Sequence, residues 1–332
     1  MVEKHGRSCL KATIIGNTSW GNTLGALLSD KGIAVKLWAR SKAEVEALDQ
    51  GQRSYYSTSH IGEALDEAEL VIWAVPSQSL RQNVSQAKDY LTDSMLLMSA
   101  AKGLEVNSGQ RMSQVLAEEI APSLRDQICV LSGPNLAKEI GQSLPAASVI
   151  AARDISLAER ARKLMESPRF FLTTCDDIIG VELGGALKNI IALGAGMIDG
   201  LDLGDNAKGA FISWGWTEVV SLGVTLGARV GTFHGLAGLG DLIATCSSTL
   251  SRNHYVGYEI AKGRSLSEIS ASMPNVAEGV ATTQAAHRLA KNQGLKLPII
   301  DLMYGILFEG LSPGQASIDF KELTASHKWS LD

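Results

Sequence analysis

The chain carries little excess charge. Its 332 residues have a formal net charge of −5, only 20% of them are charged, and Lys and Arg are scattered rather than gathered in one stripe. Surfaces that bind nucleic acid are usually basic and clustered. This composition therefore argues against a nucleic-acid partner and favours small molecules as ligands.

Cysteine and histidine are also sparse. Cys9, Cys129, Cys175 and Cys246 lie far apart without a C-x-x-C pair, and the six histidines never adopt the spacing of metal ligands. We expect four reduced thiols and no metal site.

Long apolar runs are missing. The start, MVEKHGRSCLK, lacks the apolar core of a signal peptide, and we find no stretch with the roughly 18 apolar residues that cross a bilayer. Internal repeats and low-complexity tracts are absent as well. We therefore expect a cytoplasmic protein that is not an integral membrane protein.

The first half contains short apolar runs of strand length. They lie at 12–15, 34–38, 70–75, 95–100, 128–132, 147–152 and 169–174. Amphipathic stretches such as 22–32 and 110–120 separate several of them. Alternation of buried strands with helices is typical of a parallel sheet covered on both faces, so the first half is predicted to be a doubly wound α/β domain of the Rossmann type.

The second half is helical in pattern. From about residue 178, apolar residues recur every three or four positions, clearly so in 178–200, 208–228 and 280–294. Since a chain of this length usually divides, we predict a dinucleotide-binding domain over 1–177 and an all-α domain over 178–332. Six glycines fall between Gly180 and Gly200, and they indicate either close helix packing, which we favour, or approach of a ligand.

The turn after the first apolar run resembles a dinucleotide-binding loop, G-x-G-x-x-G. Gly16 and Gly21 occupy the outer glycine positions, and Thr18 stands at the middle one. A Cβ there pushes a pyrophosphate outward, yet the helix N-terminus still offers N–H groups, and the Thr18 and Ser19 hydroxyls can donate. We expect the site to survive; the alternative is a plain strand-to-helix turn whose glycines serve only geometry.

Arg40 ends the second strand, where an NAD-binding site often carries an acid. With Ser41 and Lys42 beside it, Arg40 suits the 2′-phosphate of NADP, which an acid would repel. We therefore expect NADP(H) to be preferred, with NAD(H) as the alternative cofactor. A solvated surface arginine is the competing interpretation.

Lys188 is surrounded by apolar residues and glycine for a turn on either side, except for Asn189. A lysine in such a desolvated place can transfer protons near neutral pH, as a general acid or base. The alternative is a lysine whose stem lies along the helix while its ammonium group reaches water.

Several motifs occur in one order along nearly the whole chain. They are G-x-x-S-W-G at 16–21, KGLE from Lys102, SGP from Ser132, GGALKN ending at Asn189, GLAGLGDL ending at Leu242, SRN at 251–253 and EG at Glu278. In these motifs the chain resembles the NAD(P)-dependent glycerol-3-phosphate dehydrogenases of the bacterial type. That resemblance implies a Rossmann-type N-terminal domain, a helical C-terminal domain for substrate and dimerisation, an active site in the cleft between them, and a homodimer.

The same resemblance implies the reaction and its residues. The reaction is reversible reduction of dihydroxyacetone phosphate to sn-glycerol 3-phosphate, feeding glycerophospholipid synthesis. Lys188 becomes the proton donor to the substrate oxygen, Lys102 a second cation at the substrate, Asp241 the carboxylate that holds Lys188 or a substrate hydroxyl, and Arg252 with Asn253 the phosphate grip. The further substrate contacts implied are Gly133, Asn135 and Ser251. Together with the loop, the predicted cofactor-binding residues are Gly16, Thr18, Ser19, Trp20, Gly21, Arg40, Lys102, Ala137, Arg252, Val276 and Glu278.

Three further positions depart from the family pattern besides Thr18. Asn135 stands where the family usually has Ser or Thr, Leu136 replaces a Phe, and Trp214 in SWGW stands where the family more often has an arginine. Because the catalytic and phosphate-binding residues all remain, we predict an active enzyme with altered cofactor affinity.

Two alternatives compete with this interpretation. One is another dehydrogenase with the same two domains, of the hydroxyacid or ketopantoate type, which also uses Lys and Asn; the Arg252 and Asn253 pair argues instead for a phosphorylated substrate. The other is a nucleotide sensor that kept the fold and lost turnover. The complete set of catalytic residues in this sequence argues against such a sensor.

Overall fold

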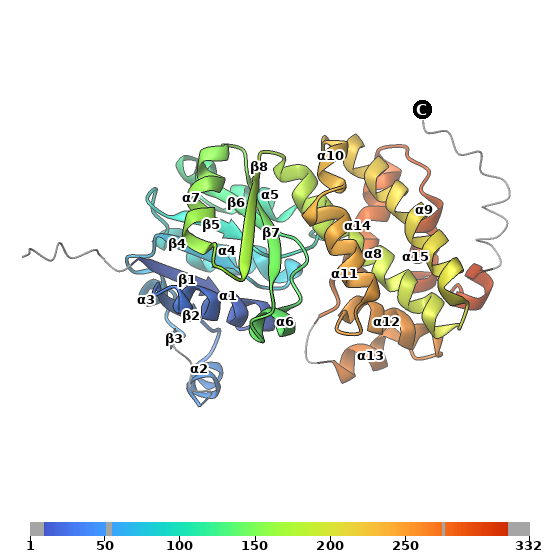
Figure 1. The fold of residues 1–332 in the computed structure, drawn as a ribbon, viewed down its shortest axis with the longest axis horizontal. Helices are drawn as coiled ribbons and strands as arrows, with labels where there is room; N and C mark the ends of the chain where they lie inside the picture. The colour runs from blue at the N-terminus through green and yellow to red at the C-terminus, as the bar shows by residue number, and fades with distance from the viewer. Residues whose placement is uncertain (1–9, 51–54, 274–275, 318–332) are drawn as a thin grey trace, which may run out of the picture. The chain divides into compact units, whose positions relative to one another are not determined.

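A single sheet organises the first part of the chain in the computed structural model, which describes residues 10–50, 55–273 and 276–317 (Figure 1). Its strands run in the spatial order β3-β2-β1-β4-β5-β6-β7-β8. They are β1 (Lys11–Ile15), β2 (Ala34–Trp38), β3 (Tyr56–Thr58), β4 (Leu70–Trp73), β5 (Leu96–Ser99), β6 (Ile128–Ser132), β7 (Ala146–Ala152) and β8 (Phe170–Cys175). Each of the seven predicted apolar runs lies on a strand, which confirms the α/β assignment.

The sheet differs from the prediction in two respects. The short strand β3 was missed because its sequence, YST, is polar and carries no apolar run. The pair β6 and β7 is antiparallel, whereas every other neighbouring pair is parallel. The helix between them, α6 (Ala137–Gly141), has only five residues, which is too short to carry the chain back along the sheet for a parallel crossover.

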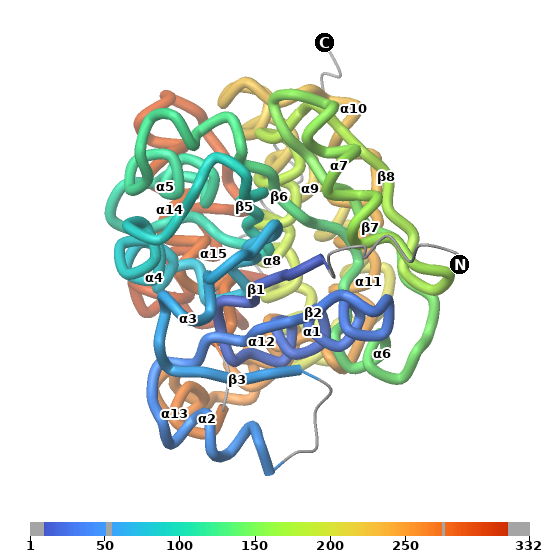
Figure 2. The backbone as a smooth tube through the Cα atoms, turned by 90° about the vertical axis from the view of Figure 1, so that its left-hand side faces the viewer, coloured from blue at the N-terminus to red at the C-terminus, as the bar shows by residue number. Residues whose placement is uncertain are grey.

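Helices cover both faces of this sheet. One apolar core packs α1 (Ser19–Asp30), α6 and α7 (Ile155–Met165) onto one face, and a second packs α3 (Ile61–Leu65), α4 (Leu80–Ala87) and α5 (Met112–Glu119) onto the other (Figure 2). The remaining elements of this region are α2 (Lys42–Asp49) and the 3₁₀ turns Ser77–Ser79, Lys88–Tyr90 and Pro122–Gln127. The central strands β4, β5 and β6 are buried from both sides, as their continuous apolar runs indicated, whereas the edge strand β8 alternates buried and exposed residues.

The chain divides into two compact units that do not follow sequence order throughout. One unit contains the described residues as far as Ala101 together with Met112–Ile178, and the other contains Lys102–Arg111 together with the described residues from Ile179 onward. The segment Lys102–Arg111 therefore folds with the second unit, although it lies between strands of the first.

The second unit is helical, as predicted. Its elements are α8 (Ile178–Gly200), α9 (Gly204–Thr225), α10 (Val230–Phe233), a π-helical turn (Leu236–Gly240), α11 (Asp241–Ser247), α12 (Arg252–Ala261), α13 (Leu266–Ser272), α14 (Glu278–Asn292) and α15 (Pro298–Phe308). One apolar cluster gathers side chains from most of these helices, and α8 contributes more members to it than any other element. This unit thus has its own core, built around α8.

Glycines let other elements approach α8 closely. A Cβ on Gly196 would lie 2.0 Å from the carbonyl oxygen of His254 on α12, and one on Gly194 would lie 2.1 Å from the ring of Phe211. From the other side, a Cβ on Gly257 of α12 would lie 1.9 Å from the carbonyl oxygen of Leu193. The favoured interpretation of these glycines, close helix packing, is confirmed at these positions.

The prediction that no stretch is long and apolar enough to cross a membrane was wrong in one place. By length and composition α8 qualifies, but 94% of its most apolar window is buried inside the protein. We missed it because Lys188, Glu182 and the glycines interrupt its apolar run. The burial identifies α8 as the central helix of a helical core.

Cys129, Cys175 and Cys246 are free thiols, while Cys9 lies outside the described residues. Burial raises the pKa of Cys129 and of Cys246 to about 12, so both are poor nucleophiles. Within the described ranges no group of three or more His, Cys, Asp or Glu side chains is placed to hold a metal ion.

Candidate active site

The turn between β1 and α1 requires glycine at both of its outer motif positions. Gly16 has a positive φ of 121°, and a Cβ on it would lie 2.7 Å from Cγ1 of Val75. A Cβ on Gly21 would lie 2.3 Å from the carbonyl oxygen of Gly16. These contacts fold the turn tightly at the carboxyl end of β1, the position at which a doubly wound sheet binds a pyrophosphate.

Thr18 caps the helix instead of opening the loop. Its backbone is extended (φ −114°, ψ 163°), and its hydroxyl oxygen accepts from the Gly21 N–H at 2.9 Å. The same hydroxyl donates to the carbonyl oxygen of Ala74 at 2.7 Å, which ties the turn to the end of β4. The Thr18 hydroxyl hydrogen is thus used within the protein in this structure, and its donation to a cofactor stays a prediction.

Polar groups without partners lie at and just after the carboxyl ends of β5 and β6, on the same edge of the sheet as this turn. Among the described residues, the buried Ser99 and Ser132 hydroxyls at the ends of β5 and β6 and the Nδ2 atom of Asn135 make no hydrogen bond. The Trp20 ring packs edge-on against Phe170, with centroids 6.5 Å apart, and its buried Nε1–H makes no hydrogen bond to a described residue. Orphaned donors and a glycine cradle at the carboxyl ends of the strands fit a nicotinamide dinucleotide.

Arg40 follows β2, and within the described part of the chain it makes a surface contact with Glu44. Its guanidinium lies 3.2 Å from Glu44 Oε1, its backbone N–H donates to Glu44 Oε2 at 3.1 Å, and its side chain is 77% exposed. Ser41 caps α2 by accepting from the Glu44 N–H. An exposed ion pair contributes little to stability, so Arg40 is free to exchange Glu44 for a phosphate.

Gly133 and Asn135 follow β6. Gly133 has a φ of 145°, and a Cβ on it would lie 2.8 Å from Cα of Ser148 on β7. The Ser148 hydroxyl donates to Oδ1 of Asn135, which orients the orphaned Nδ2 of that amide. Ala137 begins α6 just beyond them. The departure from the family pattern at position 135 thus keeps a polar group with a free donor.

In the second unit, one buried carboxylate joins two lysines. Lys188 Nζ lies 3.0 Å from Asp241 Oδ1, and Lys102 Nζ lies 2.7 Å from Asp241 Oδ2. The Lys188 ammonium also donates to the Thr245 hydroxyl, which in turn donates to the Asp241 carbonyl oxygen at 2.6 Å. The side chains of Lys188 and Asp241 are 7% and 3% exposed. These predicted residues therefore meet, and they form a network with an excess of positive charge.

The electrostatics of this network concern Lys102 above all. Burial lowers the pKa of Lys102 to about 8; the neighbouring Lys188 lowers it as well, and Asp241 acts in the opposite direction. Desolvation disfavours an isolated ammonium, and one carboxylate cannot neutralise two. An anionic or electron-rich oxygen would be favoured at this place.

The start of α12 holds the predicted phosphate-binding residues. Ser251 caps this helix by accepting from the His254 N–H. The buried Asn253 donates to Asn189 Oδ1 at 2.8 Å and accepts from the Gly279 N–H at 2.9 Å. Arg252 is more exposed and lies near Glu278 at the start of α14. Asn253 is thus fixed to α8 and α14, while Val276 is 49% exposed in the segment before α14.

Sequence analysis missed Thr245 and the structural role of Asn189. Thr245 lies four residues after Asp241 on one helix, a spacing that places both side chains on one face and could have identified it. Asn189 was noticed only as an exception to an apolar neighbourhood. Trp214, at the family's arginine position, packs against the core of the second unit.

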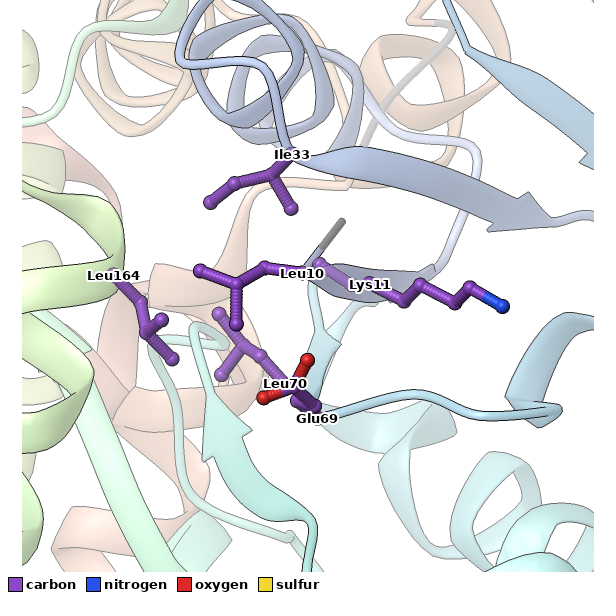
Figure 3. Close-up of a pocket in the computed structure, with 7 residues that line it drawn as sticks. Leu10, Lys11, Ile33, Glu69, Leu70 and Leu164 are labelled. Atoms are coloured by element: carbon purple, nitrogen blue, oxygen red, sulfur yellow. The ribbon is translucent and has the colours of Figure 1, made fainter. Parts of the chain in front are cut away.

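One small hollow lies in the first unit, at the edge of the sheet opposite the glycine turn. It lies at the amino ends of β1 and β4, where Leu10, Ile33, Leu70 and Leu164 gather (Figure 3). Ligands of doubly wound sheets bind at the opposite, carboxyl edge. We assign no function to it.

Comparison with known proteins identifies the family. The family models described as NAD-dependent glycerol-3-phosphate dehydrogenase N-terminus and C-terminus match residues 11–158 and 177–317. A glycerol-3-phosphate dehydrogenase [NAD(P)+] of Dehalococcoides mccartyi is 50% identical, covering 97% of this chain and 94% of that protein. The Streptomyces coelicolor enzyme of the same name is 41% identical over 92% of this chain and 94% of its own.

Solved structures agree. The glycerol-3-phosphate dehydrogenase of Coxiella burnetii matches with a TM-score of 0.89 and 30% identity, over 94% of this chain and 99% of that one. A ketopantoate reductase from Ralstonia eutropha reaches a TM-score of 0.61 at 14% identity, over 93% of this chain and all of its own, and shares the fold alone. The chain belongs to the NAD-dependent glycerol-3-phosphate dehydrogenase family.

Proposed function

We propose that this protein reduces dihydroxyacetone phosphate to sn-glycerol 3-phosphate with NAD(P)H, and catalyses the reverse reaction. The observation that carries the proposal is the buried Asp241 carboxylate between the ammonium groups of Lys102 and Lys188. A carbonyl oxygen that gains negative charge during reduction would be stabilised beside two such cations.

Lys188 acts as the general acid. When bound, the reduced nicotinamide supplies a hydride to the carbonyl carbon. Lys188 then gives a proton to the carbonyl oxygen, and in the reverse direction its neutral amine takes that proton back. An ammonium group has three donors, and Asp241 and Thr245 occupy two of them. The third is left for the substrate oxygen.

The phosphate of the substrate is held at the start of α12. The planar guanidinium of Arg252 suits a phosphate dianion, and the Ser251 and Asn253 side chains add neutral donors. Asn253 is held rigidly by Asn189 and Gly279, which supports a fixed binding position. Lys102 serves as the second cation at the substrate, and Gly133 and Asn135 add contacts from the first unit.

The cofactor is NADP(H) in preference to NAD(H), and its 2′-phosphate pairs with Arg40. Thr18 contributes through its backbone and through its cap on α1. The proposed cofactor-binding residues are Gly16, Thr18, Ser19, Trp20, Gly21, Arg40, Lys102, Ala137, Arg252, Val276 and Glu278. We assign residues 1–177 to cofactor binding and 178–332 to substrate binding and dimerisation, in a cytoplasmic homodimer whose product enters glycerophospholipid synthesis.

The test is the initial rate of NADPH and NADH oxidation by the purified protein with dihydroxyacetone phosphate, beside unphosphorylated dihydroxyacetone. Turnover confined to the phosphorylated substrate supports the proposal, and the ratio of the two cofactor rates tests the role of Arg40. Equal rates with both ketones would contradict the proposed phosphate-binding role of Arg252 and Asn253. No rate with either cofactor would contradict the proposed reaction.

A further inference from the structure

The segment Lys102–Arg111 brings Lys102 to the second unit as a small closed loop. Its ends are joined by an antiparallel bridge between Leu104 and Arg111. Within it, the Glu105 N–H donates to the Gln110 carbonyl at 2.9 Å, and the Gly109 N–H donates to the Glu105 carbonyl at 2.8 Å. The loop therefore moves as one piece, and whatever anchors its end also places its beginning.

Two anchors hold this loop. Leu104 is fully buried in the core of the second unit. At the end of the loop, Arg111 forms an ion pair with Glu182 of α8, and the two side chains are only 13% and 7% exposed. An apolar contact fixes how deeply a side chain is buried but hardly its orientation, whereas a charge-assisted hydrogen bond fixes both its position and its orientation.

The helix that carries Glu182 also carries Lys188. Six residues separate them on α8, which corresponds to about 9 Å along a rigid helix at 1.5 Å per residue. One helix thus holds the loop anchor and the proton donor, while Asp241 of α11 meets the two lysines between them. We propose that Arg111 and Glu182 are positioning residues that hold Lys102 against Asp241.

This inference rests on the proposed function for the role of Lys102 in catalysis, but not for its placement. In the folded protein burial keeps the pKa of Lys102 near 8. If the loop loses its anchor, Lys102 becomes solvated, and its pKa moves upward toward that of an ordinary lysine because burial is the largest cause of the shift. The placement can therefore be measured without substrate or cofactor.

The experiment compares Arg111→Met with Arg264→Met in the full-length protein. Arg264 is the matched control, since it pairs with Glu259 at 2.6 Å in the same unit, away from Lys102. Brief acetic anhydride labelling between pH 6.5 and 10, read by peptide mass spectrometry, gives the pH midpoint for Lys102 and for Lys188. We expect Arg111→Met to raise the Lys102 midpoint by more than about one pH unit, with the Lys188 profile and the control unchanged.

Other outcomes would overturn the proposal. An unchanged Lys102 midpoint in folded Arg111→Met means that the pair is only structural, and equal changes at both lysines mean that the whole core has loosened. Should Arg111→Met fail to fold by circular dichroism, the milder Glu182→Gln and Arg111→Lys variants take its place. Arg111→Lys keeps the charge and should restore part of the wild-type profile.

Kinetics give a second readout. If positioning is the role, turnover lost in Arg111→Met and in Lys102→Met will not add in the double variant, because both changes remove the same group from the substrate. Full additivity would contradict the proposal. Absence of any reductase activity in the wild-type protein would defeat the proposed function, while the labelling result would still decide the placement.

Discussion

The glycine turn of the first unit and the lysine network of the second are built in opposite ways. The turn lies within the six consecutive residues Gly16–Gly21, with one added bond from Thr18 to Ala74, and Thr18 shows that a side chain can replace a glycine if its φ is negative. The network joins Lys102, Lys188 and Asp241 from distant parts of the chain. A local site of backbone groups tolerates substitution, whereas a buried site of charges does not, because each loss leaves a partner unpaired.

The largest effect is expected at Lys188. In Lys188→Ala, turnover should fall by about a thousandfold, since general acid catalysis contributes factors of this size. NADPH binding, measured by fluorescence titration, should survive because the turn lies in the other unit. Retained turnover in the folded variant would exclude Lys188 as the proton donor.

Asp241 tests the cost of unpaired charge. Asp241→Asn leaves two buried ammonium groups facing each other, so the free energy of unfolding should fall by about 3 kcal/mol. Because Asp241 raises the pKa of Lys102 against burial, that pKa should fall further below 8. Urea titration at pH 7 and at pH 9 provides the measurement.

The loss of unfolding free energy in Asp241→Asn should be smaller at pH 9 than at pH 7, because Lys102 is largely neutral at pH 9. Glu268→Gln at the exposed cap of α13 is the control for the loss of a single carboxylate. A deficit that is the same at both pH values would contradict the pairing.

An effect of intermediate size is expected at Arg40, whose charge lies on the surface. In Arg40→Glu the preference for NADPH over NADH, as a ratio of kcat/KM, should fall by about tenfold or more, because a charge-assisted phosphate contact is replaced by repulsion. Arg169→Glu is the control, because Arg169 is an exposed residue just before β8 whose guanidinium donates to the Ser143 carbonyl oxygen. An unchanged ratio would place the 2′-phosphate elsewhere.

The smallest effect is expected at Thr18. Thr18→Ala removes the cap and the bond to Ala74, so the free energy of unfolding should fall by about 1 kcal/mol. NADPH affinity should change little, since the hydroxyl is bonded to Ala74 and Gly21 within the protein, and Thr18→Ser should recover most of the stability. A large loss of NADPH affinity with unchanged stability would reverse this assignment.

The same contrast explains how far sequence could lead. Strands buried on both faces can be recognised in the sequence as continuous apolar runs, and α8 was predicted over its full length, 178–200. The polar strand β3 and the direction of β7 have no such signal, because periodicity reports burial and not direction. Motifs indicated Lys188 and Asp241, but a motif does not say which atoms meet.

Some outcomes depended on tertiary structure alone. That Lys102 folds with the second unit follows from Leu104 and Arg111 finding partners there. That the Thr18 hydroxyl donates to Ala74 follows from the position of this residue just after the neighbouring strand β4. Neither partner is adjacent in sequence, so no local pattern could indicate it.

The glycines at the crossing of α8 and α12 have a consequence for how this chain can be cut. Small residues that let two helix backbones touch are the device by which membrane helices associate, and here Gly196 and Gly257 play that part inside a protein core. In a fragment that ends before α12, the surface of α8 beside Gly196 would be left uncovered. Since α8 is apolar and long enough for a bilayer, such a fragment would be prone to insert into membranes or to pair with another copy of itself.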